Sequence, residues 1–323
     1  MSLKKSIGCI KKNKAFLITS HTSPEGDALG SELAFYRLLK KLGKQAIIVN
    51  EDPLPVGYEF LPGVENIKKF KKNLKYPPFD CLVTLDCTHL KRSGEVSSLN
   101  SAARQVLNID HHISNLGFGD INWIEPYSSS CAEMVYIIYK KLNVPLDKES
   151  ALCLYTGILT DTGSFHYSNT SARTHKIVAH LVGFGLDIAQ IYKAIYENIP
   201  YPEMKLLSNI LPGMKACAQG RIIWFQIKHN FLRRRKLSFD LSESILTFGR
   251  AVKGAEVVAL FKENLGVKDE IRVNLRSHGR VDVNKIASFF GGGGHKNASG
   301  ITIRGKIDPV RRRVLRKIEE ALQ

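Results

Sequence analysis

The chain has 323 residues, of which 44% are hydrophobic, and a formal net charge of +17 from 47 basic and 30 acidic residues. This length exceeds one typical domain core, so we expect two domains, and the composition excludes a largely disordered chain. No run approaches the roughly 20 apolar residues of a membrane helix, so we expect no membrane span.

The cysteines indicate a reducing environment. Six of them are scattered through the chain without a CxxC pair, and several lie in apolar runs such as CLVTLDC. This usage is typical of small buried side chains rather than of a disulfide framework. The first residues, MSLKKSIGCIKKNK, have no apolar stretch of the length found in signal peptides. We therefore expect a soluble, cytoplasmic protein.

The first part of the chain alternates strand and helix patterns. Four short apolar runs end in polar residues, as buried parallel strands do, at 15–20, 45–50, 81–86 and 104–110. An amphipathic stretch follows the first run, and three helical patterns lie between Ser128 and Gly185. This alternation predicts an α/β domain over residues 1–186, with a Rossmann-like parallel sheet.

A smaller mixed α/β domain is expected at 203–323, after a connector at 187–202. Strand patterns lie at 221–228, 256–263, 270–277 and 300–305, and helical patterns near 241–252, 282–290 and 309–322. Residues 1–202 carry 23 basic and 19 acidic side chains, whereas residues 203–323 carry 24 and 11. The second domain is therefore suited to attract a polyanion, although a solvated basic surface explains the same charge.

Metal-competent side chains follow three of the four strand patterns in the first domain. They are His21, Glu25 and Asp27 after the first, Asp86 at the end of the third, and Asp110, His111 and His112 at the end of the fourth. Asp161 stands where a helical pattern breaks. Taken singly, Glu25 and Asp27 are explained as turn or helix N-cap residues. Because parallel strands bind ligands outside their carboxyl ends, these side chains are expected to converge. Their oxygen and imidazole donors favour Mn²⁺ or a similar divalent ion, and there are enough of them for two ions.

The same residues fall into ordered motifs. These are HTSPEGDALGS at 21–31, LD at 85–86, NIDHH at 108–112, TDTGSF at 160–165 and VNLRSHGRVDVNKIASFFGGGGHKNASG at 273–300. Together they resemble the DHH phosphoesterases and the glycine-rich domain attached to them, in the branch of nanoRNases and pAp phosphatases. The resemblance implies an enzyme that hydrolyses short oligonucleotides to mononucleotides and 3′-phosphoadenosine 5′-phosphate to AMP. Because the basic second domain lies across a connector from the domain with the metal-competent residues, we also expect an active-site cleft between the two domains.

The resemblance assigns a role to each site residue. One Mn²⁺ ion is expected on His21, Glu25 and Asp86, and a second on Asp27, Asp86, His111 and Asp161, with Mg²⁺ or Co²⁺ as alternative metals. A water activated by both ions attacks the phosphate in line. Asp110 orients a ligand, and His112 faces the scissile phosphate. The terminal phosphate or nucleotide of the substrate is held by Arg276, Gly292, Gly293, Gly294 and His295.

Two positions depart from the family pattern. Glu25 stands where aspartate is commoner, and its extra methylene moves the carboxylate relative to the first ion. His166 stands where we expect arginine. The four glycines at 291–294 also fit a flexible linker, and Arg276 also fits a surface arginine. The runs Arg233–Arg235 and Arg311–Arg313 are interpreted chiefly as solvated helix faces, with RNA steering as the alternative.

Other functions remain open at this point. The alternatives within the superfamily are a single-strand exonuclease, a pyrophosphatase, and a hydrolase of the linear products of cyclic dinucleotides. A non-catalytic nucleotide-binding regulator belongs to a different class. The expected partners are short single-stranded RNA or DNA and nucleotide bisphosphates. A homodimer is compatible with the sequence, which leaves the oligomeric state and the direction of cleavage open.

Overall fold

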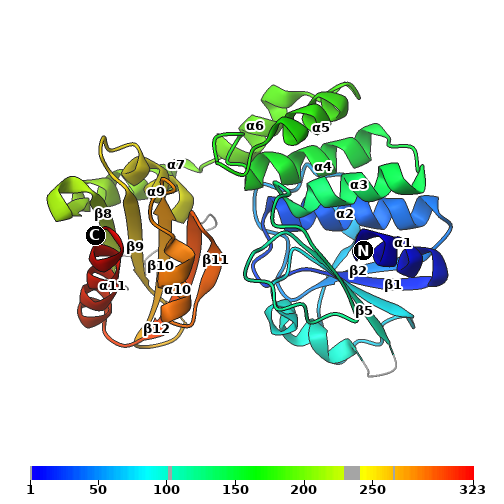
Figure 1. Ribbon diagram of the computed structural model, residues 1–323, viewed down its shortest axis with the longest axis horizontal. Coiled ribbons are helices and arrows are strands. Elements are labelled where there is room, and N and C mark those ends of the chain that lie inside the picture. Colours follow the sequence, from blue (N-terminus) through cyan, green and yellow to red (C-terminus); the bar gives the residue numbers. More distant parts are fainter. Residues whose placement is uncertain (1, 101–103, 229–240, 265) are drawn as a thin grey trace. The chain divides into compact units, whose positions relative to one another are not determined.

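The computed structural model describes residues 2–100, 104–228, 241–264 and 266–323. The chain forms two compact units, Met1–Asn198 and Ile199–Gln323, and each unit has its own six-stranded sheet (Figure 1). The first unit extends past residue 186, because helix α6 (Ile188–Tyr196) packs on its core through Ile191 and Ile195. The mixed α/β fold class expected from the sequence is confirmed.

All six strands of the first unit are parallel, in the order β3-β2-β1-β4-β5-β6. They are β1 (Ala15–Thr19), β2 (Gln45–Asn50), β3 (Ile67–Lys69), β4 (Cys81–Leu85), β5 (Gln105–Asp110) and β6 (Ile121–Ile124). Every residue of β4 is buried, as expected for a parallel sheet covered on both faces. The four strands expected from the sequence are present. β3 and β6 have only three and four residues, so no apolar pattern reveals them.

Helices α1 (Ser2–Lys12), α2 (Gly26–Lys41) and α3 (Cys131–Leu142) pack on one face of this sheet. Helix α4 (Lys148–Asp161) packs on α2 and α3, and α5 (Ala172–Val182) packs on α4, in a core that also includes residues of α6 (Figure 1). A smaller core on the other face includes Leu17, Leu82 and Val106, with Val96 from the 3₁₀ segment η2 (Leu90–Leu99). Another short 3₁₀ turn, η1 (Val64–Asn66), precedes β3.

Helices α2 and α4 approach each other closely because glycine stands at their contact. A methyl group at Gly30 would lie 2.3 Å from the carbonyl oxygen of Cys153. One at Gly157 would lie 2.8 Å from Asp27 Oδ1. This close approach brings the first turn of α2 beside the C-terminal half of α4, where Asp161 is the last residue.

The second unit also has six strands, in the order β11-β12-β10-β9-β8-β7. They are β7 (Lys215–Cys217), β8 (Ile222–Ile227), β9 (Val257–Glu263), β10 (Glu270–Ser277), β11 (Gly293–His295) and β12 (Ala298–Arg304). Among the strands described in this unit, β8 and β9 pair in parallel and the other neighbours are antiparallel. The four strands expected from the sequence are again present. The basic run Arg233–Arg235 lies outside the described residues.

Helices pack on both faces of the second sheet. The helices are α7 (Tyr201–Ile210), α9 (Ser242–Arg250), α10 (Val283–Phe289) and α11 (Ile307–Ala321), and short 3₁₀ turns lie at Leu211–Gly213 and Ala218–Gly220. One core joins α10 and α11 to the sheet, and another joins α7 and α9 to it. Among the helices that the structure describes, none combines the length and the apolar character needed to cross a membrane.

Candidate metal and catalytic site

Three adjacent strands of the first unit end at the candidate site. His21 lies two residues after β1, Asp86 directly follows β4, and Asp110 ends β5, and these strands are neighbours in the sheet. Asp86 has a left-handed backbone (φ 54°), and its amide donates to the carbonyl oxygen of Ile109 at 3.1 Å. This conformation is uncommon outside glycine, and it turns the chain sharply at the strand end.

Asp86 lies at the centre of the cluster. Its Oδ2 is 3.5 Å from His21 Nε2, and its Oδ1 is 3.6 Å from His111 Nε2 and 3.4 Å from His112 Nδ1. The carboxyl is 5% exposed. Within the described part of the chain, Asp86 Oδ1 has no partner in hydrogen-bonding geometry. A buried carboxylate oxygen in that position is suited to bind a cation.

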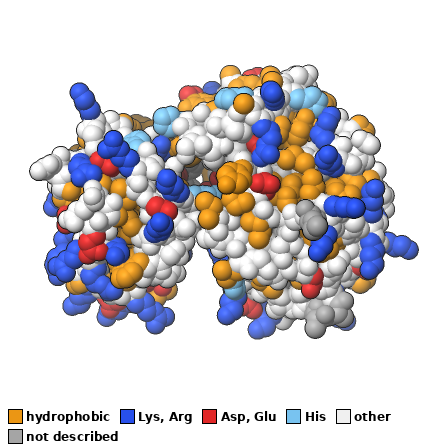
Figure 2. Space-filling view, viewed as in Figure 1, with side chains coloured by type: hydrophobic (Ala, Val, Ile, Leu, Met, Phe, Trp, Pro, Cys, Tyr) orange, Lys and Arg blue, Asp and Glu red, His pale blue; other side chains and the backbone are white. Residues whose placement is uncertain are grey.

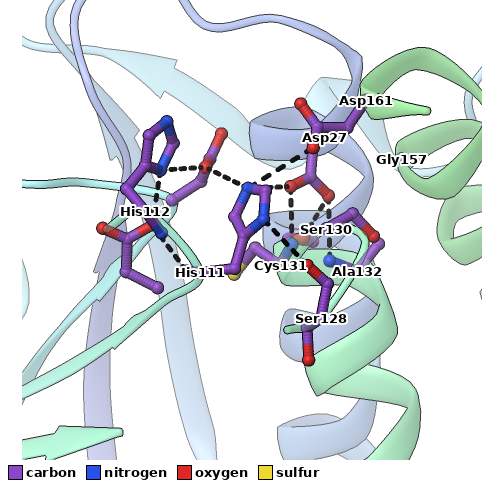
Figure 3. A network of polar contacts seen from close by, with 12 residues as sticks. Asp27, His111, His112, Ser128, Ser130, Cys131, Ala132, Gly157 and Asp161 are labelled. Atoms are coloured by element: carbon purple, nitrogen blue, oxygen red, sulfur yellow. Dashed lines mark hydrogen bonds and ion pairs between the residues drawn. The ribbon is translucent and has the colours of Figure 1, made fainter. Parts of the chain in front are cut away.

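His111 joins Asp86 to two further carboxylates. Its Nε2 lies 3.8 Å from Asp27 Oδ2 and 3.5 Å from Asp161 Oδ2, and its Nδ1 lies 3.3 Å from the carbonyl oxygen of Ser128 (Figure 3). The Ser128 contact fixes the ring orientation and directs Nε2 toward the acids, as a backbone carbonyl commonly does for a metal-binding histidine.

The N-terminus of α3 holds Asp27 in place. Asp27 Oδ2 accepts from the amide of Cys131 at 2.6 Å, and its Oδ1 accepts from the amide of Ala132 at 2.8 Å (Figure 3). Ser130 caps the same helix through the amide of Glu133. The Asp27 carboxylate thereby satisfies two otherwise unpaired donors at the start of the helix, and they in turn fix a residue about 100 positions earlier in the chain.

Asp110 orients the two histidines that follow it. Its Oδ1 accepts from the His111 amide at 2.8 Å and contacts His112 Nδ1 at 2.7 Å. Its Oδ2 accepts from Asn115 Nδ2 at 2.6 Å, and the same amide group donates to the carbonyl oxygen of Cys87 at 3.0 Å. Asn115 therefore links the turn after β4 to the turn after β5.

Asn115 belongs to none of the motifs in the sequence. The nearest signal is the spacing of Asn108, Asn115 and Asn122, but nothing local shows that these side chains meet. In the structure Asn108 Nδ2 donates to both Asn115 Oδ1 (3.0 Å) and Asn122 Oδ1 (3.2 Å). The asparagines thereby tie the loop after His112 to β5 and β6.

An ion pair between buried Glu133 and the partly exposed side chain of Arg173 supports the segment that contacts His111. Glu133 is fully buried and binds Arg173 at 2.6 Å, and it accepts from Ser129 Oγ at 2.7 Å and Thr174 Oγ1 at 2.9 Å. Arg173 also donates to Ser128 Oγ at 3.2 Å. Sequence reasoning misses this pair because its members lie on different helices, α3 and α5.

Asn169 links Asp161 to the same segment, at Ser129. Asn169 Nδ2 donates to the carbonyl oxygen of Ser129 at 2.8 Å and to that of Asp161 at 3.1 Å, and it lies 3.4 Å from Asp161 Oδ2. The residues 128–132 thus contact Asp27, His111 and the support of Asp161 at once. The carboxylates and imidazoles therefore have fixed positions relative to one another.

The buried charges perturb one another strongly. Burial, followed by the charges of Asp86 and Asp161, raises the pKa of Asp27 well above its usual range, and burial likewise raises the pKa of Asp161. Burial also acts to raise the pKa of Asp86, but the imidazoles of His111 and His21 outweigh it and hold that pKa well below the usual value. The pKa of His111 is raised well above its usual value: burial acts to lower it, but Asp161 and Asp86 outweigh that effect. Such clustering of perturbed groups is typical of functional sites.

These donors fit divalent cations. Within the first unit, two groups of described residues have ligand atoms that lie within 4.8 Å of one another: Asp27, His111 and Asp161, and Asp86, Asp110, His111 and His112. Three carboxylates packed this closely repel one another unless a cation neutralises them. Oxygen and imidazole donors without thiolate suit Mn²⁺ or a similar ion.

Glu25 and His166 lie at the margin of this arrangement. Glu25 is the exposed N-cap residue of α2, and His166 is exposed beside Tyr167, with ring centres 6.1 Å apart. Neither residue belongs to the two described groups of ligand atoms within 4.8 Å. Their roles at the metals and the phosphate stay predictions.

In the second unit, the glycine run adopts a defined backbone. Gly294 has φ 143°, and a methyl group at Gly292 would lie 2.2 Å from the carbonyl oxygen of Gly300. The run leads into β11, which pairs with β12 and contains His295. The guanidinium of Arg276 forms an ion pair with the carboxylate of Glu243. A phosphate at Arg276 would compete with that carboxylate.

Comparisons with known proteins agree with this geometry. The family described as "DHH family, N-terminal domain" matches residues 15–158, and the "DHHA1 domain" family matches residues 236–323. A relative from Thermus thermophilus, named "Bifunctional oligoribonuclease and PAP phosphatase NrnA", is 33% identical over 94% of this chain and 89% of its own length. A relative of the same name from Bacillus subtilis is 24% identical over 89% of this chain and 88% of its own length.

A solved structure shares the fold over nearly the whole chain. It is an exopolyphosphatase-related protein from Bacteroides fragilis, with a TM-score of 0.85 and 26% identity. The similarity covers 99% of this chain and 95% of that one.

Proposed function

Because this chain belongs to the DHH family and carries a DHHA1 domain, we propose that it is a metal-dependent phosphoesterase. Its proposed substrates are short oligonucleotides, which it hydrolyses to mononucleotides, and 3′-phosphoadenosine 5′-phosphate, which it converts to AMP. The names of the Thermus thermophilus and Bacillus subtilis relatives support this choice of substrates. One observation carries the proposal: Asp27, Asp86, Asp161 and two histidines meet at the carboxyl ends of adjacent buried strands.

We propose that this cluster holds two divalent ions, with Mn²⁺ preferred over Mg²⁺ or Co²⁺. Asp86 would bridge them, His21 and Glu25 would complete one site, and Asp27, His111 and Asp161 the other. Such ions lower the pKa of water toward neutrality and neutralise charge that develops on phosphoryl oxygens. The bridging role of Asp86 is supported by its contacts with His21 on one oxygen and His111 on the other.

The protein's own groups position the substrate and its protons. His112 contacts Asp110 through Nδ1, at 2.7 Å, so Asp110 fixes the orientation of the ring. We propose that the opposite nitrogen, Nε2, faces the scissile phosphate and hydrogen-bonds one of its oxygens. The chain requires no side-chain nucleophile, and Cys131, the thiol beside Asp27, has a pKa that burial raises well above the usual value.

We further propose that the second unit binds the terminal phosphate or nucleotide of the substrate. Arg276 offers a guanidinium fork suited to phosphate, and Gly292, Gly293 and Gly294 leave the backbone amides accessible beside His295. Recognition of an end at a fixed place favours short substrates. Turnover should therefore fall as the oligonucleotide lengthens.

The experiment uses two aspartates that flank the same strand. Asp86 follows β4, whereas Asp80 precedes it and accepts from the amides of Lys14 (2.9 Å) and Ala15 (3.0 Å) at the amino end of the sheet. Labelled RNAs of two to about 24 nucleotides and 3′-phosphoadenosine 5′-phosphate are incubated with each metal. Asp86→Ala should abolish hydrolysis, and Asp80→Ala should retain it. Equal activity of the two variants would exclude the bridging role.

The same panel separates the competing functions. Preference for long strands would favour the single-strand exonuclease, and preference for inorganic pyrophosphate would favour the pyrophosphatase. Preference for linear dinucleotides would favour the hydrolase of cyclic-dinucleotide products. Tight nucleotide binding without turnover, with any of the three metals, would favour a regulator.

A further inference from the structure

The basic run Arg311–Arg313 does not form a uniformly solvated surface. It lies in α11, whose rotation is fixed by the buried residues Ile307, Val310, Val314 and Ile318. These leave Arg312 and Arg316 exposed on the outer face of the helix. Arg311 and Arg313 lie on its two flanks, and each stacks on an aromatic ring.

On one flank, cations lie over Trp224 of β8. The guanidinium of Arg311 is 4.8 Å from the centre of the ring, and the ammonium of Lys215 is 5.3 Å from it. Arg311 also binds Asp308 at 2.6 Å and contacts Gln226, so its position is held by several groups.

On the other flank, cations lie over the two aromatic residues at the end of α10. Lys317 is 4.6 Å from the centre of the Phe289 ring, and Arg313 is 5.6 Å from that of Phe290. The two rings contact each other edge to face, with centres 5.0 Å apart. Phe289 is 65% exposed, which is unusual for a phenylalanine in a folded unit.

Cations that stack on aromatic rings are concentrated on this helix. Helix α11 supplies the cation for three such contacts, with Trp224, Phe289 and Phe290. The unit also carries most of the charge of the chain, since residues 203–323 have 24 basic and 11 acidic side chains. Figure 2 shows Lys and Arg side chains over the visible face of this unit.

We propose that the outer face of α11, with Phe289, is a binding surface for single-stranded RNA. Arg312 and Arg316 would contact phosphates, and the exposed Phe289 ring would stack on a base. Proteins that bind single strands combine a basic surface with exposed aromatic rings in this way. A duplex offers no open base for Phe289, and an acidic peptide offers no planar partner. The choice of RNA rests on the proposed function, whereas the surface itself involves none of the residues assigned to hydrolysis.

Such a surface has a physical consequence for longer substrates. Phosphate contacts release counterions, so affinity should fall steeply with salt, and for a single strand each lost contact should reduce the slope of log affinity against log salt by about 0.7. Base stacking contributes about 1–3 kcal/mol per base, which corresponds to roughly a 5- to 150-fold change in affinity. The surface would hold a longer RNA on the enzyme through contacts that a dinucleotide is too short to make.

The test measures binding without hydrolysis. A fluorescein-labelled 12-nucleotide RNA is titrated with the Asp86→Ala protein in EDTA, and anisotropy is recorded from low to high salt. Arg312→Glu/Arg316→Glu should weaken binding at least tenfold and flatten the salt dependence. The control, Lys253→Glu/Arg272→Glu, changes the net charge equally with two exposed residues outside α11, and it should change affinity less than twofold. Equal weakening by both pairs would overturn the proposal, because charge alone would then explain it.

Phe289→Ala tests the stacking. It should weaken RNA binding about fivefold or more and leave binding of inorganic polyphosphate unchanged. If it affects neither ligand, the surface does not bind bases and the proposal fails. Turnover of a dinucleotide by the otherwise intact enzyme should be the same with and without the α11 substitutions. If the enzyme without these substitutions does not hydrolyse the dinucleotide, the result counts against the proposed function. If Arg312→Glu/Arg316→Glu leaves RNA binding unchanged in the anisotropy assay, the result counts against this surface alone.

Discussion

Glu32 provides a quantitative test of the electrostatics in the first unit. It lies in α2, five residues after Asp27, and is fully buried. Asn50 Nδ2 donates to its Oε2 at 2.8 Å. Burial nevertheless raises the pKa of Glu32 from its ordinary value of 4.5 to about 7. The informative substitution is Glu32→Gln, which removes the titrating group and keeps an acceptor for Asn50.

The direction of the effect follows from proton binding. Between pH 4.5 and 7 the folded protein retains a proton on Glu32 that the unfolded chain has lost. The free energy of unfolding therefore falls as pH rises through this window. The difference between the two pKa values corresponds to about 3 kcal/mol. Relative to wild type, Glu32→Gln should gain about 3 kcal/mol between pH 4 and pH 8. Any constant cost of the amide cancels in that comparison.

Urea unfolding in EDTA measures this gain. The chain has two tryptophans, so a Trp224→Phe background leaves Trp123, which is 4% exposed in the first unit, as the only tryptophan reporter. Exposed Glu65→Gln serves as the matched control and should follow wild type at every pH. If Glu32→Gln and wild type differ by the same free energy at pH 4 and pH 8, burial does not perturb Glu32 and the reasoning is refuted.

Three further predictions concern the support of the site. Asn115→Ala removes the side-chain amide that donates to both Asp110 and the Cys87 carbonyl oxygen. The kcat of hydrolysis should fall at least tenfold with little change in KM. An unchanged kcat would show that Asp110 needs no such support. Arg173→Ala leaves the carboxylate of Glu133 buried without its cation; because the Arg173 side chain is 46% exposed and water screens the pair, the substitution should cost about 1–3 kcal/mol in urea unfolding. Arg173→Ala/Glu133→Gln should recover much of the loss, and no recovery would argue against the ion pair. Gly157→Ala places a methyl group 2.8 Å from Asp27 Oδ1 and should weaken Mn²⁺ binding measured by calorimetry. The control Gly8→Ala, with no atom within 4 Å of the added methyl group, should leave metal binding intact and stabilise α1 by about 0.5–1 kcal/mol; equal metal affinity in the two variants would contradict the steric argument.

Local sequence determined the strands and the types of ligand at their ends. Buried parallel strands are apolar on both faces, so 81–86 and 104–110 stand out from the helical patterns around them. Parallel strands place their carboxyl ends on one edge, and that rule alone brings Asp86 and Asp110 together. His21 also reaches Asp86 in the structure, as the strand rule predicts. The family motifs added the assignment of Asp161, which no strand end supplies.

Only the tertiary structure decided how these ligands are held. Asp27 depends on two amides at the start of α3, and His111 on the carbonyl of Ser128, across contacts that no local pattern encodes. Asn115 and the Glu133–Arg173 pair escape sequence reasoning for the same reason, because a polar side chain far along the chain gives no periodic signal. The run Arg311–Arg313 has the sequence of a solvated face. The rotation of α11, fixed by its buried residues, instead places two of the three arginines over aromatic rings. Composition reports which side chains are available, whereas packing decides which of them meet.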